Sequence, residues 1–87
     1  MYLHLGQNTV VSEDSVIGIF DLDKTTSSKE TRKFLSIAEK EHYLINIPDD
    51  IPKSFVLCNE SKKNTVYLSQ LNSQTLLKRT KGVTVNA

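Results

Sequence analysis

The chain of 87 residues carries a formal charge of +1 at neutral pH, and 38% of its residues are hydrophobic and 24% charged. This length predicts one domain with one small core, and this composition excludes a chain that is disordered throughout. No apolar run approaches the roughly 18 residues of a membrane span, and the start lacks the pattern of a signal peptide, so we expect a cytoplasmic protein without membrane contact.

The first part of the chain predicts a hairpin followed by a buried strand. Residues 2–5 and 9–12 are typical of two short strands around Gly6 and Asn8, which tolerate the backbone of a tight connection. Both alternate faces of residues 16–20 are apolar, which predicts a central strand that is covered on both sides. Gly18 inside this strand indicates a bulge or a close approach of another backbone.

The middle of the chain predicts an amphipathic helix. Ser27 and Glu30 have the spacing of a capping box, in which each side chain binds a free backbone amide at the start of a helix. Phe34 and Ala38 recur at helical spacing on one face, and the helix is expected to end near His42. Residues 43–47 fit either a short strand or an extended connection.

The second half predicts another hairpin and a short helix. Residues 53–58 and 65–70 alternate like strands on either side of a polar tip at residues 59–64. Asn72 is expected to cap a C-terminal helix that Gly82 ends. We therefore predict a single α+β domain over residues 1–82, followed by a tail at residues 83–87. Its sheet is expected to be small, mainly antiparallel and of about five strands, with one amphipathic helix and the short C-terminal helix.

Residues 21–25 look like a catalytic motif. They resemble the nucleophile motif of haloacid dehalogenase-type phosphatases, in which Asp21 would attack phosphorus, Asp23 would handle the leaving-group proton and Thr25 would contact phosphate. That chemistry also needs Mg²⁺ and a parallel sheet of several βα units, and the remaining chain of about 60 residues does not predict them. The single cysteine, Cys58, has no partner for a disulfide or a metal pair. We therefore predict no catalytic residue, no metal site and no cofactor.

Charge is distributed unevenly along the chain. Residues 1–23 hold four acidic residues and no lysine or arginine, whereas residues 58–87 hold five cations and one anion. Such a division can bring together opposite surfaces of identical subunits, or it can present a basic face to a polyanion.

Several separated blocks of the chain resemble one family. Residues 1–11, 17–26, 52–56 and 67–79 look like the RemB (YaaB-type) extracellular matrix regulators of Firmicutes, which are relatives of the biofilm regulator RemA. The resemblance implies a small cytoplasmic DNA-binding transcriptional regulator with a fold like LytTR-type DNA-binding domains. It also implies homo-oligomers, in the form of rings that can wrap double-stranded DNA.

The resemblance is uneven at the cations. RemA-like proteins carry arginines at the positions of Ser15, Asp50 and Ile51, and within that region this chain keeps a cation at Lys53. Replacing a cation by an anion beside a phosphate turns attraction into repulsion. One alternative is therefore a module of the same fold that binds protein partners, including a RemA-like relative, instead of DNA.

The expected DNA-binding residues are Lys53, Lys78, Arg79 and Lys81. Less favoured candidates are Lys62, Lys63, Lys24, Lys29, Arg32 and Lys33. The last four surround the start of the first predicted helix, where positive charge opposes the helix dipole.

Overall fold

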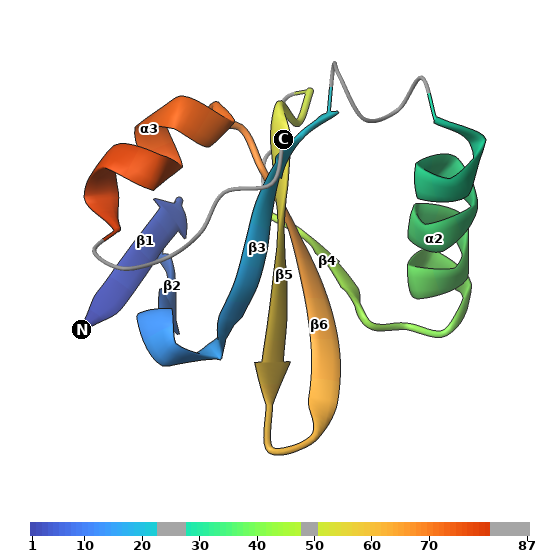
Figure 1. The fold of residues 1–87 in the computed structure, drawn as a ribbon, viewed down its shortest axis with the longest axis horizontal. Helices are drawn as coiled ribbons and strands as arrows, with labels where there is room; N and C mark the ends of the chain where they lie inside the picture. Colours follow the sequence, from blue (N-terminus) through green and yellow to red (C-terminus); the bar gives the residue numbers. More distant parts are fainter. Residues whose placement is uncertain (23–27, 48–50, 81–87) are drawn as a thin grey trace.

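The computed structural model describes residues 1–22, 28–47 and 51–80. The chain begins with a two-stranded hairpin of β1 (Tyr2–Gly6) and β2 (Thr9–Ser12), and a four-stranded sheet follows in the order β3-β5-β6-β4. The remaining elements are η1 (Glu13–Ser15), β3 (Val16–Asp21), α2 (Lys29–Lys40), β4 (Leu44–Asn46), β5 (Ser54–Glu60), β6 (Lys63–Ser69) and α3 (Ser73–Arg79). The hairpin and α3 lie on one side of the four-stranded sheet and α2 lies on the other (Figure 1). The α+β prediction is therefore confirmed.

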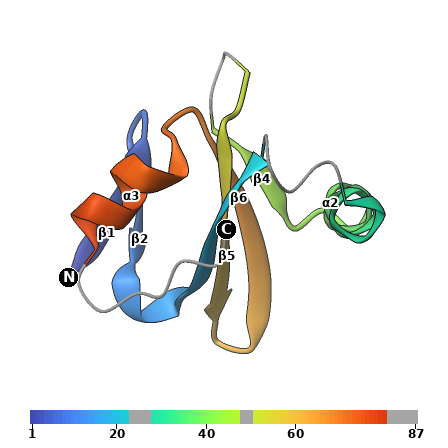
Figure 2. The ribbon, with the colours of Figure 1, turned by 45° about the horizontal axis from the view of Figure 1, so that its top comes forward.

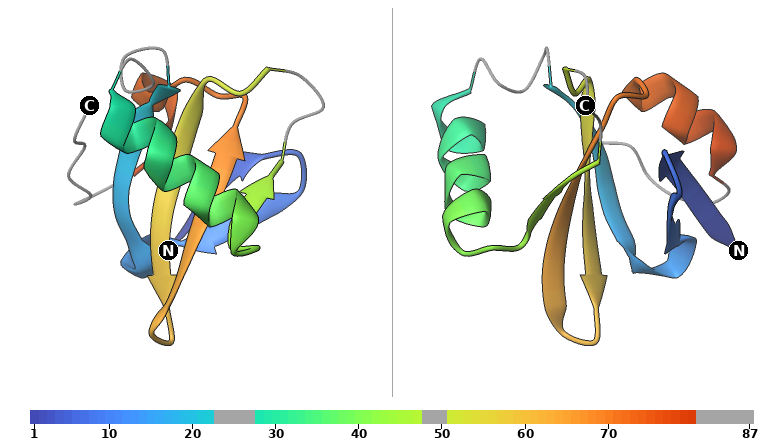
Figure 3. Two further views of the ribbon diagram at one scale, coloured as in Figure 1. Left: turned by 90° about the vertical axis from the view of Figure 1, so that its right-hand side faces the viewer. Right: turned by 180° about the vertical axis from the view of Figure 1, so that it is seen from behind.

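The core has two parts, one on each face of the four-stranded sheet. The first part joins the hairpin and α3 to the sheet and contains Leu3, Leu5, Val11, Ile19, Val56, Cys58 and Leu76. The second part joins α2 to the opposite face and contains Leu22, Ala38, Phe55 and Val66. Figure 2 shows the two helices separated by the sheet, and the left view of Figure 3 shows α2 lying across its strands.

The prediction of a central strand at residues 16–20 is wrong, because β3 is at an edge of the sheet and β5 and β6 are central. The register against β5 shifts between Val16 and Gly18, which confirms the predicted bulge. At the bulge the Ile17 side chain is 52% exposed. The apolar pattern therefore predicted one more buried side chain than the strand has. Both faces of β3 are nevertheless covered, since Ile19 packs in the first part of the core and Phe20 against the second.

The two predicted hairpins are confirmed. In β5, Phe55 faces α2, whereas Val56 and Cys58 face the first hairpin, as the alternation predicted. The strands extend further than expected, because Glu60 pairs with Lys63 and only two residues turn the chain between them. Both turn residues have positive φ angles, which matches the twist of an antiparallel pair.

The cap of α2 is Ser28 rather than the predicted Ser27. The Thr31 backbone amide donates to the Ser28 hydroxyl oxygen at 3.4 Å, and that hydroxyl donates to the Glu30 carboxylate at 3.1 Å. Ser27 lies outside the described residues. Only Ser27 has an acidic residue three positions later, whereas Ser28 is followed at that spacing by Thr31, so the capping-box pattern places the helix start one residue too early.

The end of α2 is also earlier than predicted. The helix ends at Lys40, and His42 follows it with a left-handed φ of 66°. Residues 43–47, for which a strand and a connection were both open, contain β4, and Leu44 pairs in parallel with Val66 of β6. The sheet is therefore mixed, and the described residues form six strands where about five were expected.

Two buried serines form hydrogen bonds that connect the hairpin and α3 to the end of the sheet. Ser54 and Ser69 face each other across β5 and β6, and both side chains are fully buried. Ser69 donates to the Leu5 carbonyl at 2.6 Å and accepts from the Leu71 amide at 3.1 Å, while Ser54 donates to the Leu71 carbonyl at 2.7 Å. Because Leu71 directly precedes α3, these bonds fix where that helix begins.

Burial raises the pKa of the Cys58 thiol from 9.0 to about 11, an effect that the charge of Glu60 increases and a hydrogen bond with Ser15 opposes. The folded chain therefore holds this proton more tightly than the unfolded chain. Its stabilising contribution is complete below pH 9 and is lost as the pH rises towards 11. We expect the free energy of unfolding, measured in urea, to fall more steeply over this range in the wild type than in Cys58→Ala. Equal slopes would contradict the assignment.

Candidate nucleic-acid interface

Two of the predicted DNA-binding residues lie together at the end of α3. The Thr75 amide donates to the Asn72 side-chain oxygen at 2.7 Å, which confirms the predicted cap and fixes the start of the helix. Leu76 is fully buried against the hairpin and the sheet, which fixes its rotation. Lys78 and Arg79 consequently leave the last turn as exposed side chains.

The two cations differ in how firmly they are held. The Arg79 guanidinium donates to the His4 carbonyl of β1 at 3.3 Å, which ties the end of α3 to the hairpin. A guanidinium has five N–H donors, so most remain for a ligand. The Lys78 side chain makes no hydrogen bond or ion pair within residues 1–22, 28–47 and 51–80. Lys81, the third predicted member, lies outside the described residues.

Lys53 lies at the other end of α3. Its backbone amide donates to the Ser69 carbonyl at 2.8 Å, and its own carbonyl accepts from the Leu22 amide at 3.0 Å, while its side chain is exposed. The following residue binds the carbonyl that precedes α3, so Lys53 is close to the start of the helix. A helix of seven residues is about 10 Å long. Lys53 and the pair Lys78 and Arg79 therefore form two groups rather than one patch.

The less favoured lysines of the second hairpin are further away. Lys62 and Lys63 are exposed at the turn between β5 and β6, at the end of the sheet opposite to Lys53 (Figure 1). They can contact the same ligand as Lys53 only if that ligand follows the whole length of the sheet.

Comparison with known proteins establishes the family. Residues 2–80 match the family model described as "RemA-like: Extracellular matrix regulatory protein A-like". The chain belongs to the RemA-like family. Over 79 residues it is 37% identical to Extracellular matrix regulatory protein B of Bacillus subtilis (strain 168), a match that covers 91% of this chain and 89% of that protein. The predicted resemblance to RemB-type regulators is thus confirmed, and the chain is an extracellular matrix regulator of the RemA/RemB type.

RemA-like proteins are expected to carry arginine at three positions, and the structure of this chain describes two of them. Ser15 is buried, and its hydroxyl donates to the Ser12 carbonyl at 2.7 Å. Ile51 is 79% exposed and offers an apolar side chain to solvent. Asp50 lies outside the described residues. Any contact with a polyanion must therefore use cations elsewhere on the molecule.

The phosphatase-like motif does not sit in a phosphatase-like sheet. Asp21 ends β3, which pairs in antiparallel fashion with β5, whereas the motif needs parallel strands. Asp23 and Thr25 lie outside the described residues. No three His, Cys, Asp or Glu side chains gather at a metal-binding distance in the described part of the chain. The RemA-like family is regulatory and is not a known enzyme family.

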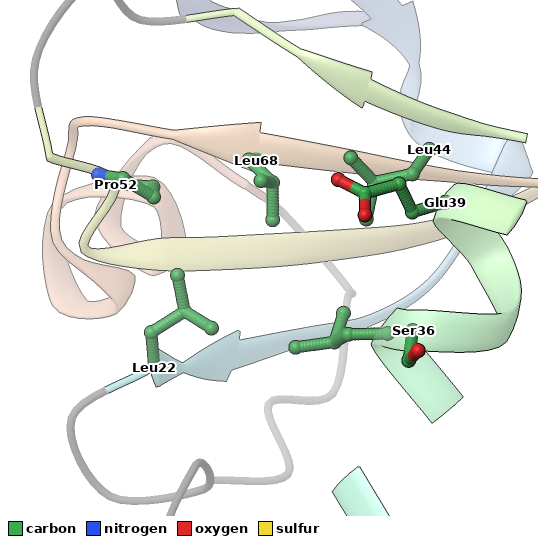
Figure 4. A pocket seen from close by; sticks show the side chains of 7 residues that line it. Leu22, Ser36, Glu39, Leu44, Pro52 and Leu68 are labelled. Carbon is green, nitrogen blue, oxygen red and sulfur yellow. The ribbon is translucent and has the colours of Figure 1, made fainter. Parts of the chain in front are cut away.

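A pocket of about 460 Å³ opens between α2 and the sheet (Figure 4). Its walls are mainly apolar, and its residues are Leu22, Leu35, Ser36, Glu39, Leu44, Pro52 and Leu68. Ser36 and Glu39 are the polar side chains among its described lining residues. Within the described residues, no helix has the length and apolar character needed to cross a membrane.

One basic surface, on α2, received too little weight in the sequence-based prediction. Lys29, Lys33 and Lys40 are exposed on α2, and helical geometry of 100° per residue places them within about 40° of one another. The prediction weighed Lys29 and Lys33 by their distance from the helix start, and it interpreted Lys33 and Lys40 as part of a solvated charged face. The spacing of four and seven residues is the signal that would have grouped them.

Proposed function

We propose that this RemA-like protein is a cytoplasmic transcriptional regulator that binds double-stranded DNA as a homo-oligomer, through contacts to the phosphate backbone. The observation that carries the proposal is the exposed pair Lys78 and Arg79 at the anchored end of α3, in a family of extracellular matrix regulators. Cations held at a fixed position bind phosphates and release condensed counterions. Lys53, near the start of the same helix, and Lys81 complete the proposed set.

The proposal depends on repetition of weak contacts. A subunit of net charge +1 has little general attraction for DNA. When identical subunits are joined, each further contact occurs at a high effective concentration, so a few cations per subunit suffice. The ring assembly and the LytTR-like relation of the fold, both implied by the resemblance, belong to this proposal.

Several exposed apolar side chains support self-association. Tyr2 and Val10 are exposed on the hairpin, Ile17 on the edge strand β3 and Ile45 on the edge strand β4. Edge strands keep unpaired backbone groups that can pair with another chain. Apolar side chains beside such edges favour burial between subunits.

A second candidate function is a protein-interaction module of the same fold that does not bind DNA. The buried Ser15 and the apolar, exposed Ile51 favour it, because they stand where DNA-contacting arginines are expected. Such a module would associate with itself or with a RemA-like relative.

Sedimentation velocity separates these candidates. The protein is run with and without a duplex of about 30 base pairs, at low and at near-physiological salt. The first proposal predicts oligomers in both salts and co-sedimentation with DNA that weakens steeply as salt rises. The second predicts the same oligomers without DNA binding at either salt. A protein that sediments as a monomer and does not bind DNA at low salt would contradict both candidate functions.

Lys78→Glu tests the proposed contact. We expect weaker DNA binding and a salt dependence of log K that is shallower by about 1 for each lost phosphate contact, with the oligomer intact. Lys62→Glu is the matched control, since it makes the same charge change at the distant hairpin turn. Equal losses in the two variants would show that net charge, rather than the end of α3, determines binding.

A further inference from the structure

The outward face of α2 is basic along its whole length. Lys29, Lys33 and Lys40 form one line, and Phe34 and Ala38 lie on the opposite face, packed against the sheet. We call these three lysines the α2 lysine line. The helix acids Glu30 and Glu39 fall about 80–100° to either side of it, so they do not interrupt it.

The α2 lysine line is free for a ligand. All three side chains are exposed, and none makes a hydrogen bond or ion pair in the part of the chain that the structure describes. The right view of Figure 3 shows α2 as the outermost element on its side of the sheet. No other described element covers its outward face.

Two of the three lysines are unfavourable for the helix itself, whereas Lys40 lies in the last turn, where the helix dipole favours a cation. Lys29 is the first residue of α2, where the helix dipole repels positive charge. Lys29 and Lys33 are four residues apart, the spacing at which like charges repel across one helical turn. Glu30 lies three residues before Lys33, but its carboxylate accepts a hydrogen bond from the Ser28 hydroxyl, and within the described residues neither Lys29 nor Lys33 forms an ion pair. The line is therefore better explained by an external anion than by the stability of the helix.

We propose that the α2 lysine line is a second contact surface for the phosphates of double-stranded DNA, an inference that rests on the proposed function. The lysines are about 6 Å and then about 10 Å apart along the helix axis. A duplex carries one charge per about 1.7 Å of its axis, so each lysine meets phosphate along the same stretch. The contact neutralises charge and does not identify bases.

DNA fits this surface better than a membrane does. A helix that binds a membrane inserts its apolar face between lipids. In α2 that face is occupied, because Phe34 packs with Phe55 and Ala38 is fully buried. The lysine line therefore offers charge to a ligand, as phosphate-backbone binding requires, although Ile37 beside it is 44% exposed.

The test is a variant with Lys29→Gln, Lys33→Gln and Lys40→Gln. Its affinity for a duplex of about 20 base pairs is measured by fluorescence anisotropy over a series of salt concentrations. We expect affinity at low salt to fall at least about tenfold, and the salt dependence of log K to become shallower by about 2 to 3, near 0.9 for each lost contact. Urea unfolding of the variant should show a fold as stable as the wild type or more stable, since a repulsion has been removed.

The matched control is Lys62→Gln with Lys63→Gln, which removes charge at the distant hairpin turn. Wild-type affinity in the α2 variant, or a loss per charge equal to that of this control, would overturn the inference. If Lys78→Glu weakens binding and the α2 variant does not, the proposed function holds and the α2 surface is refuted. If the wild type binds no duplex at low salt, both are refuted.

An anionic vesicle of phosphatidylserine provides the last arm. The proposal would be overturned if the wild type bound these vesicles and the α2 variant did not, while both proteins had the same affinity for DNA. That result would assign the α2 lysine line to membrane binding.

Discussion

Replacing Leu76 by alanine is expected to lower the free energy of unfolding by about 2–5 kcal/mol. Leu76 has no exposed surface and belongs to the part of the core that joins α3, the hairpin and the sheet. Truncation removes buried apolar surface and leaves a cavity that two separate structural units line. In a domain of this size the loss is a large fraction of the total stability.

Urea denaturation followed by circular dichroism measures this effect. The matched control is Leu77→Ala, because Leu77 is the next residue of the same helix and is 39% exposed. The control should cost less than about 1 kcal/mol. Similar losses in the two variants would contradict the observed rotation of α3, and with it the placement of Lys78 and Arg79 in solvent.

Replacing Ser69 by alanine is expected to cost about 2–4 kcal/mol, since two backbone groups lose a hydrogen-bond partner. The Leu5 carbonyl and the Leu71 amide both bind this hydroxyl, at 2.6 and 3.1 Å. The bond to Leu5 is buried and joins β1 to the end of β6. The variant should therefore also loosen the contact between hairpin and sheet, measured as faster amide exchange in β1.

Two further variants sharpen this test. Ser36→Ala changes an exposed serine of α2 that makes no hydrogen bond in the described part of the chain, and it should be neutral within about 0.5 kcal/mol. Ser54→Ala removes the other serine that binds Leu71, so its effect should not add to that of Ser69→Ala. Simple additivity would show that the two serines do not act on one segment.

Elements with a clear period were predictable from the sequence. The period of two in residues 53–58 predicted both faces of β5, and the polar residue Asn72 predicted the start of α3. The edge position of β3 was not predictable in this way, since two apolar faces show that a strand is covered on both sides and not how many strands pair with it. The role of Ser69 could not be predicted from the sequence either, because its partner Leu5 is 64 residues away and becomes adjacent only in the folded chain.

The candidate site shows the same division. Lys78 and Arg79 were identifiable because they follow a predicted cap by a fixed number of residues. Phe34 and Ala38 predicted the buried face of α2, and the structure confirms that both pack in the core beside the sheet. The α2 lysine line was underestimated, since Lys29 and Lys33 were weighed against the local dipole and Lys40 was interpreted only as part of a solvated charged face.

The four-stranded sheet separates α2 from α3, so the helices that carry the two sets of cations lie on opposite sides of the subunit. If both surfaces bind DNA as proposed, one subunit can hold two duplexes, one on each side of the sheet. Such a particle would cross-link DNA molecules when DNA is in excess, and the links would disappear once enough protein has coated every molecule separately. The degree of compaction would therefore depend on stoichiometry, with a maximum at an intermediate ratio of protein to DNA.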